Sequence, residues 1–178
     1  MSLNSTFNRL MAFIGNVGGI TKAASASFTR PSNTSGYTTN DVVSNSTATP
    51  SVMEFDLHRV EGGSGYVTKG RLMTDQKTNT AQYRLHLFHT APTAINDNDP
   101  YLLLWANRAN RVGYIDFDAA STEDSTNSTA AQSLNTDVRL AFVCAAGSKK
   151  LYGILETLTD FTPASAQNFY IELTAELN

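Results

Sequence analysis

The sequence has 178 residues, which fits a single domain that is long enough to bury a core without disulfides or metal ions. Charged residues make up only 16% of the chain, and the formal net charge of −3 provides no basic surface, so we expect no nucleic-acid partner. Thr, Ser and Asn replace the missing charges, and because these residues favour strands and turns over helix interiors, the composition predicts an all-β protein.

The chain begins with residues 1–19, in which a short apolar run is interrupted by Asn and Gly. The run is too short to span a membrane and no cationic region precedes it, so we expect neither a signal peptide nor a membrane partner. We therefore predict that residues 1–19 form a flexible N-terminal arm, that residues 20–178 form the folded domain, and that the protein is made in the cytoplasm.

From residue 20 onwards, short extended segments alternate with polar turns. The segments lie at residues 20–31, 41–45, 52–60, 66–75, 81–89, 111–119, 137–146, 151–158 and 168–177, and residues 101–106 form a short apolar run. In the last segment the odd-numbered residues from Phe169 to Leu177 place most of its apolar side chains on one face. Helix is expected only at the start of the chain and within residues 124–134. Roughly eight or nine short strands of this kind predict a jelly-roll-like antiparallel β-sandwich.

Residues 66–89 predict a β-hairpin whose two strands flank the polar turn 75–80. The second strand carries His86 and His89, and their odd spacing directs them to opposite faces of the sheet unless a bulge intervenes. His58 is remote in sequence, and no cysteine or carboxylate cluster completes a ligand set near these residues. The histidines therefore indicate sheet positions, and we predict no metal site.

Cys144 is the single cysteine of the chain, so it cannot form an intramolecular disulfide. It lies in an apolar run and shares a strand face with Leu140 and Phe142. No histidine or basic residue is adjacent in sequence to lower its pKa. We therefore predict a buried, inert thiol.

The acidic residues form two pairs that could carry chemistry. Asp97 and Asp99 resemble half of a calcium loop, but the glycine and distant glutamate of an EF-hand are absent, which favours a plain turn. Asp116 and Asp118 would project from one strand face about 7 Å apart, within the spacing of an inverting glycosidase pair. Trp105 is expected in the core. We predict no catalytic residue and no cofactor.

Five segments carry a family resemblance: "FTRPSNTSGYTTNDVVSNSTATP", "GGSGYVTKGRLMTDQKTNTAQYRLHLFHTAPT", "NRANRVGYIDF", "FVCAAGSKKLYGILETL" and "FTPASAQNFYIELTAE". In this order they resemble a family of small proteins encoded among the structural genes of tailed bacteriophages. The resemblance runs from about Phe28 to the C-terminus, and the sequence before about Ile20 departs from the family. It implies a jelly-roll-like virion protein, similar to head decoration or cement proteins that clamp capsomers from outside.

We therefore expect a capsid decoration protein that is made in the host cytoplasm and binds the major capsid protein at the virion surface. A closed trimer is the expected oligomer, because it matches the local three-fold points between capsomers and gains avidity from three contacts. The N-terminal arm is expected to contact the capsid or a neighbouring subunit through four apolar side chains, Leu10, Met11, Phe13 and Ile14.

Two other hypotheses remain open at this point. A tail-associated or receptor-binding module would use loop aromatic residues, such as Tyr37 and Tyr101, to bind glycans. An enzyme would use Asp116 and Asp118, and it ranks far below the two structural roles, so the expected function is non-enzymatic.

Overall fold

A computed structural model describes residues 20–122 and 129–178. The predicted N-terminal arm, with its four apolar contact residues, lies outside the described residues. The strands are β1 (Ile20–Thr29), β2 (Val42–Val43), β3 (Met53–Asp56), β4 (Ser64–Thr74), β5 (Tyr83–Phe88), β6 (Arg111–Phe117), β7 (Ser121–Thr122), β8 (Ala131–Asn135), β9 (Leu140–Val143), β10 (Lys150–Thr157) and β11 (Asn168–Leu177). A short 3₁₀ helix, η1 (Trp105–Asn110), precedes β6.

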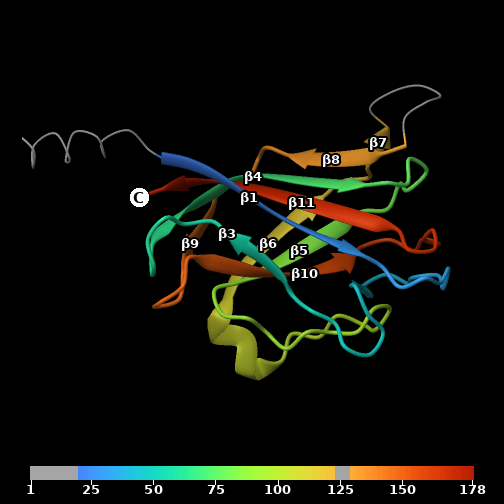
Figure 1. The fold of residues 1–178 in the computed structure, drawn as a ribbon, viewed down its shortest axis with the longest axis horizontal. Coiled ribbons are helices and arrows are strands. Elements are labelled where there is room, and N and C mark those ends of the chain that lie inside the picture. The colour runs from blue at the N-terminus through green and yellow to red at the C-terminus, as the bar shows by residue number, and fades with distance from the viewer. Residues whose placement is uncertain (1–19, 123–128) are drawn as a thin grey trace, which may run out of the picture.

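The strands form two antiparallel sheets that lie in two layers (Figure 1). One sheet has the order β1–β11–β4–β8–β7, and β9 pairs with β4 next to β8. The other has the order β2–β10–β5–β6, and β3 pairs with β10 next to β2. If β2 with β3, and β8 with β9, are each counted as one interrupted strand, and the two-residue edge strand β7 is left out, the sheets read 1-8-3-6 and 2-7-4-5, which is the order of a jelly roll. The predicted fold class, an all-β jelly-roll-like sandwich, is confirmed.

The core lies between the layers and is built from alternating positions of the strands. In β11 the side chains of Phe169, Ile171 and Leu173 are buried, as the alternation predicts. This strand is paired on both sides, with β1 and with β4, so the last segment of the chain occupies a central place in its sheet. The C-terminus therefore lies beside the start of β1, where Leu177 is opposite Ile20.

The predicted hairpin over residues 66–89 is wrong, because β4 and β5 belong to different sheets. The polar stretch between them crosses from one layer to the other. Asn79 stabilises the crossing: its side-chain amide donates to the Tyr83 hydroxyl at 2.5 Å, and its side-chain oxygen accepts the Ala81 amide at 2.9 Å. Period-two patterning is the same for strands joined by a hairpin and for strands that face each other across a core, so the pattern could not distinguish them.

Other local predictions have mixed outcomes. Cys144 is buried with 3% exposure, as expected, and burial raises the pKa of its thiol, with a further contribution from Asp56. Residues 131–135 form β8, although residues 124–134 were one of the two places to which any helix was assigned. Residues 101–106 contain no strand and lead into η1. Within the described ranges, no helix is long and apolar enough to cross a membrane.

Candidate interaction surface

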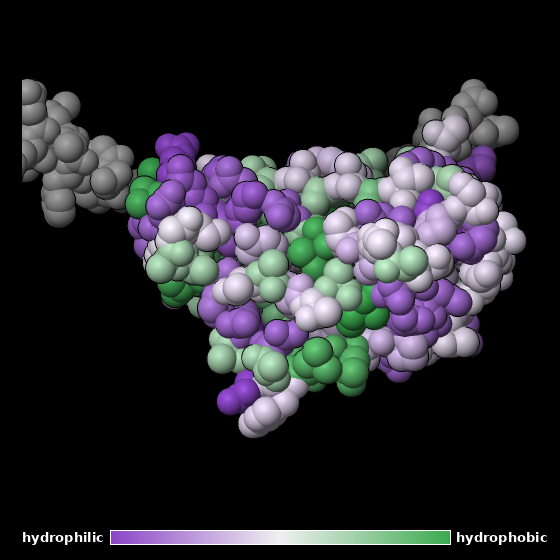
Figure 2. All heavy atoms as spheres, turned by 60° about the horizontal axis from the view of Figure 1, so that its bottom comes forward, coloured by the Kyte–Doolittle hydropathy of each residue, from purple (hydrophilic) through white to green (hydrophobic). Residues whose placement is uncertain are grey.

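The segment between β5 and β6 forms the lower end of the molecule in Figure 1 and ends in η1. Three large apolar side chains are exposed there: Leu102 at 64%, Leu104 at 43% and Trp105 at 78%. Figure 2 turns this end towards the viewer, and apolar atoms gather beside the projecting tip. We name these three residues, together with Arg108, the η1 surface.

Trp105 was expected in the core, and this prediction is wrong. The segment before it alternates, so that Leu103 is half-buried while Leu102 and Leu104 point outward, and Trp105 then begins the helical turn on the exposed side. Arg108 lies one turn further along, donates to the Trp105 carbonyl at 2.7 Å, and places its guanidinium 4.2 Å from the indole centroid. The Trp-x-x-Arg spacing was the available signal, because residues three apart meet on one helix face.

A groove of about 520 Å³ runs beside the exposed side chains. Its lining is mostly apolar, with polar groups at Thr93, Asn96, Asp99 and Asn107. The apolar part comes from Phe88, Pro92, Ala94, Ile95, Pro100, Tyr101, Leu102, Leu103, Leu104 and Ile154. A mostly apolar hollow with a few polar groups at its margin has the composition of a site for a protein or small-molecule ligand.

Tyr101 fixes this segment to the sheet beneath it. Its ring stacks on His86 of β5 with a centroid distance of 3.8 Å, and its amide donates to the Asn40 carbonyl at 2.7 Å. His86 is itself buried, and its Nε2 lies 2.6 Å from a carboxylate oxygen of Glu156. Arg111 can only donate, so its contact of 3.2 Å with Nδ1 assigns the imidazole proton to Nε2. The segment that carries the η1 surface is therefore fixed to the sheet by Tyr101 and by the polar contacts of His86.

Asp97 has a structural role that the sequence did not reveal. Its carboxylate forms an ion pair of 3.0 Å with Arg30, and both side chains are fully buried. It also accepts the Tyr37 hydroxyl at 2.5 Å and the Ser44 amide at 2.9 Å. Arg30 Nε also donates to the Tyr37 hydroxyl. A carboxylate that is engaged in this way is not a free calcium ligand, in agreement with the interpretation as a turn.

The burial of Tyr37 in this cluster contradicts one part of the glycan hypothesis. Tyr37 was expected on an exposed loop, but it is only 2% exposed. Burial, with an added effect of Asp97, raises the pKa of its hydroxyl above the ordinary value. Tyr37 therefore cannot stack on a sugar, and Tyr101, half-buried on His86, presents only part of its ring.

The histidines have separate partners. His86 contacts Glu156, whereas His89 lies beyond the end of β5 and its Nε2 is 3.1 Å from the Ala109 carbonyl. His58 is buried, and its Nδ1 lies close to the backbone of Val60. Across residues 20–122 and 129–178, no group of three or more His, Cys, Asp or Glu side chains could hold a metal ion.

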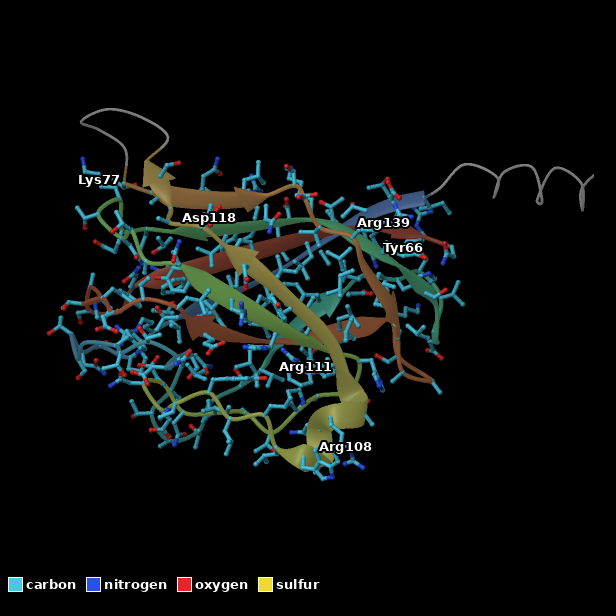
Figure 3. The ribbon with its side chains drawn as sticks, turned by 180° about the vertical axis from the view of Figure 1, so that it is seen from behind. Tyr66, Lys77, Arg108, Arg111, Asp118 and Arg139 are labelled. Carbon is cyan, nitrogen blue, oxygen red and sulfur yellow. The ribbon has the colours of Figure 1, made fainter. Side chains whose placement is uncertain are left out.

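Asp116 and Asp118 are not equivalent. Arg84 holds Asp116 by two hydrogen bonds, of 2.6 and 2.8 Å, so both of its carboxylate oxygens are engaged. Asp118 lies beyond the end of β6 and is exposed; Figure 3 labels it near the edge of the sandwich. Among the described residues Asp118 has no such partner, so the two carboxylates are not arranged as a paired acid and base. In the same view Arg108 lies at the tip of η1 and Arg111 lies above it, at the start of β6.

The chain has only weak similarity to known proteins. No family model matches the sequence, and no curated protein matches it. Among solved structures, a chain of the cyanophage Pam1 capsid asymmetric unit has 16% identity and a TM-score of 0.36, over 91% of this chain and 88% of that chain. The K3 adhesin domain of Lys-gingipain from Porphyromonas gingivalis has 11% identity and a TM-score of 0.32, over 77% of this chain and 71% of that chain.

Proposed function

We propose that this protein is a non-enzymatic structural protein of a tailed-phage virion. Its role is that of a capsid decoration or cement protein, which binds the major capsid protein at the head surface. The η1 surface is the proposed docking surface. The observation that carries this proposal is the exposure of Trp105, Leu102 and Leu104 together on one projection of an otherwise ordered β-sandwich.

The composition of the η1 surface supports a protein partner. Trp and Arg are the residues most enriched at the energetic centres of protein interfaces, and here they are already stacked on each other. Because Arg108 is held by the Trp105 carbonyl and ring, less side-chain entropy is lost when a partner binds. A trimer would present three such surfaces, so modest contacts at each could give stable attachment to the shell.

The proposal is tested with Trp105→Ala in a cosedimentation assay with undecorated phage heads. Removal of an interface centre of this kind costs about 2 kcal/mol or more, so we expect affinity for heads to fall by roughly 30-fold or more. Stability should change by less than about 0.5 kcal/mol, because the side chain is exposed.

Leu134→Ala is the matched control. Leu134 is also a large apolar side chain, 47% exposed, but it lies on β8 in the other sheet. This variant should decorate heads like the unmodified protein. If Trp105→Ala decorates heads as well as Leu134→Ala does, the η1 surface is not the docking surface.

The second candidate is a tail-associated or receptor-binding module that binds carbohydrate. The exposed indole ring favours it, because Arg108 covers one face of the ring and leaves the other available for a sugar. Binding of the full chain to host-cell glycans, lost in Trp105→Ala and combined with no binding to heads, would replace the decoration role with this one.

A further inference from the structure

The open edge of β1 is a second surface, separate from the η1 surface. Among the described residues, β11 is the strand that pairs with β1, and no backbone hydrogen bond joins the opposite edge of β1 to another described segment. The edge extends over the full 10 residues of the strand without a register shift. It is therefore a long row of available main-chain donors and acceptors.

The register shows which residues supply these groups. The Arg30 amide donates to the Gln167 carbonyl, so this pair continues the ladder as a hydrogen-bonded pair. Because hydrogen-bonded and non-hydrogen-bonded pairs alternate in an antiparallel ladder, the even-numbered residues of β1 face β11 with their backbone groups. The odd-numbered residues direct theirs to the open edge, and these are Thr21, Ala23, Ser25, Ser27 and Thr29.

The side chains at this edge do not protect it. All five outward residues are exposed, and all are small and uncharged. The one charge of the strand, Lys22, is engaged by Asp56 at 3.0 Å and by the His58 carbonyl at 3.1 Å. By contrast β3, at the corresponding edge of the other sheet, carries Glu54 and Asp56. Natural proteins usually guard a long edge with charge, proline or a bulge, and the outward positions of β1 carry none of these.

We propose that residues 1–19 of a second copy of this chain add as a strand to the open edge of β1. Residue Ile20, where β1 begins, follows the segment directly, and in extended form the segment spans up to about 60 Å, against about 33 Å for β1. Its apolar side chains can cover Ala24, Ala26 and Phe28, which are only partly buried on the inner side of the edge. Arg9 is its single charged side chain, so no carboxylate is brought against the edge.

The direction of the chain before Ile20 favours a neighbouring copy, and not the same chain, as the source of the added strand. For a segment to add to the β1 of its own chain, the backbone would have to reverse within a few residues before Ile20. Passing to a neighbour needs no reversal. An arm-to-edge contact is head-to-tail, and contacts of this kind form a ring, such as the proposed trimer, when the rotation between copies closes. This inference concerns self-association and does not rest on attachment to a capsid.

The test uses two full-length variants. Ser25→Pro removes an outward amide and places a ring on the edge, a position that an edge strand tolerates, and Ser25→Ala is its control because it keeps the amide. The second variant combines Leu10→Asp with Phe13→Asp and leaves the edge intact. Sedimentation velocity measures each protein alone and the two variants in equimolar mixture, after thermal unfolding has shown both to be folded.

We expect the unmodified protein and Ser25→Ala to associate, and each of the other variants alone to associate at least 10-fold more weakly. The mixture should form a complex, because the arm of the Ser25→Pro chain can use the edge of the other variant. A mixture that stays monomeric, or variants that associate like the unmodified protein, would overturn the inference. If the full chain self-associates as described but ignores phage heads, the decoration role fails and this inference stands.

Discussion

At the scale of single residues, the Arg30–Asp97 pair shows how a polar turn can become part of a core. Both side chains are removed from water, and each keeps further hydrogen bonds, to Tyr37 and to backbone groups. Burial of a single charge is costly, so the two charges tolerate burial only together. The pair joins the end of β1 to the segment that leads to the η1 surface.

We predict that Asp97→Ala lowers the free energy of unfolding by about 3–5 kcal/mol, because Arg30 is left buried without its counter-charge. Urea denaturation measures the change. Asp99→Ala is the control, since Asp99 lies two residues away and is exposed, and its loss should cost about 0.5 kcal/mol. Similar small losses in both variants would mean that the ion pair does not stabilise the fold.

At the scale of elements, the segment between β5 and β6 depends on the sheet for its order. It contains one short 3₁₀ helix, and its central contact is the stack of Tyr101 on His86. The pKa of His86 is lowered, with burial as the largest cause; the Glu156 carboxylate opposes this effect, and the nearby Arg111 and Arg84 add to it. Protonation of Nδ1 would also place a proton against the Arg111 guanidinium.

This arrangement predicts a pH dependence. The pKa of His86 in the folded state lies below the ordinary 6.5, so the unfolded chain binds this proton first as pH falls. The contribution of His86 to stability is complete above that value and is lost as pH falls towards the folded pKa, by at most about 1.4 kcal/mol per pH unit. Denaturation at about pH 7.5 and about pH 5 should show a larger loss for the unmodified protein than for His86→Gln. Equal losses would assign the pH dependence to other groups.

Sequence patterns predicted most strands but not which strands pair or which elements cover them. The alternation in β11 and in the run ending at Cys144 identified the buried faces correctly, because the side-chain period of a strand is a local property. The pairing of β4 with β5 was predicted incorrectly, because strand partners are chosen by contacts between distant residues. The exposure of Trp105 was missed for the same reason, since an apolar residue is buried only if another element covers it.

At the scale of the whole molecule, residues 20–178 contain both sheets and the core between them. We predict that deletion of residues 1–19 leaves this domain folded, with a melting temperature within about 4 °C of the full chain, which corresponds to about 1 kcal/mol. The comparison is made by calorimetry at a protein concentration below that of self-association, because association raises the apparent stability. Loss of a cooperative transition in the truncated protein would show that the arm is part of the fold.

The sequence by itself determined the class of the fold. Its low charge, its Thr, Ser and Asn content and the repeated short alternating segments were sufficient for an antiparallel β-sandwich, because each reflects the preference of a residue for its own backbone conformation. The tertiary structure decided which strands pair, which edge is left open along β1, and which aromatic side chains are covered. Tyr37 is buried and Trp105 is exposed, against expectation in both cases, because burial depends on what packs over a residue and not on the residue itself.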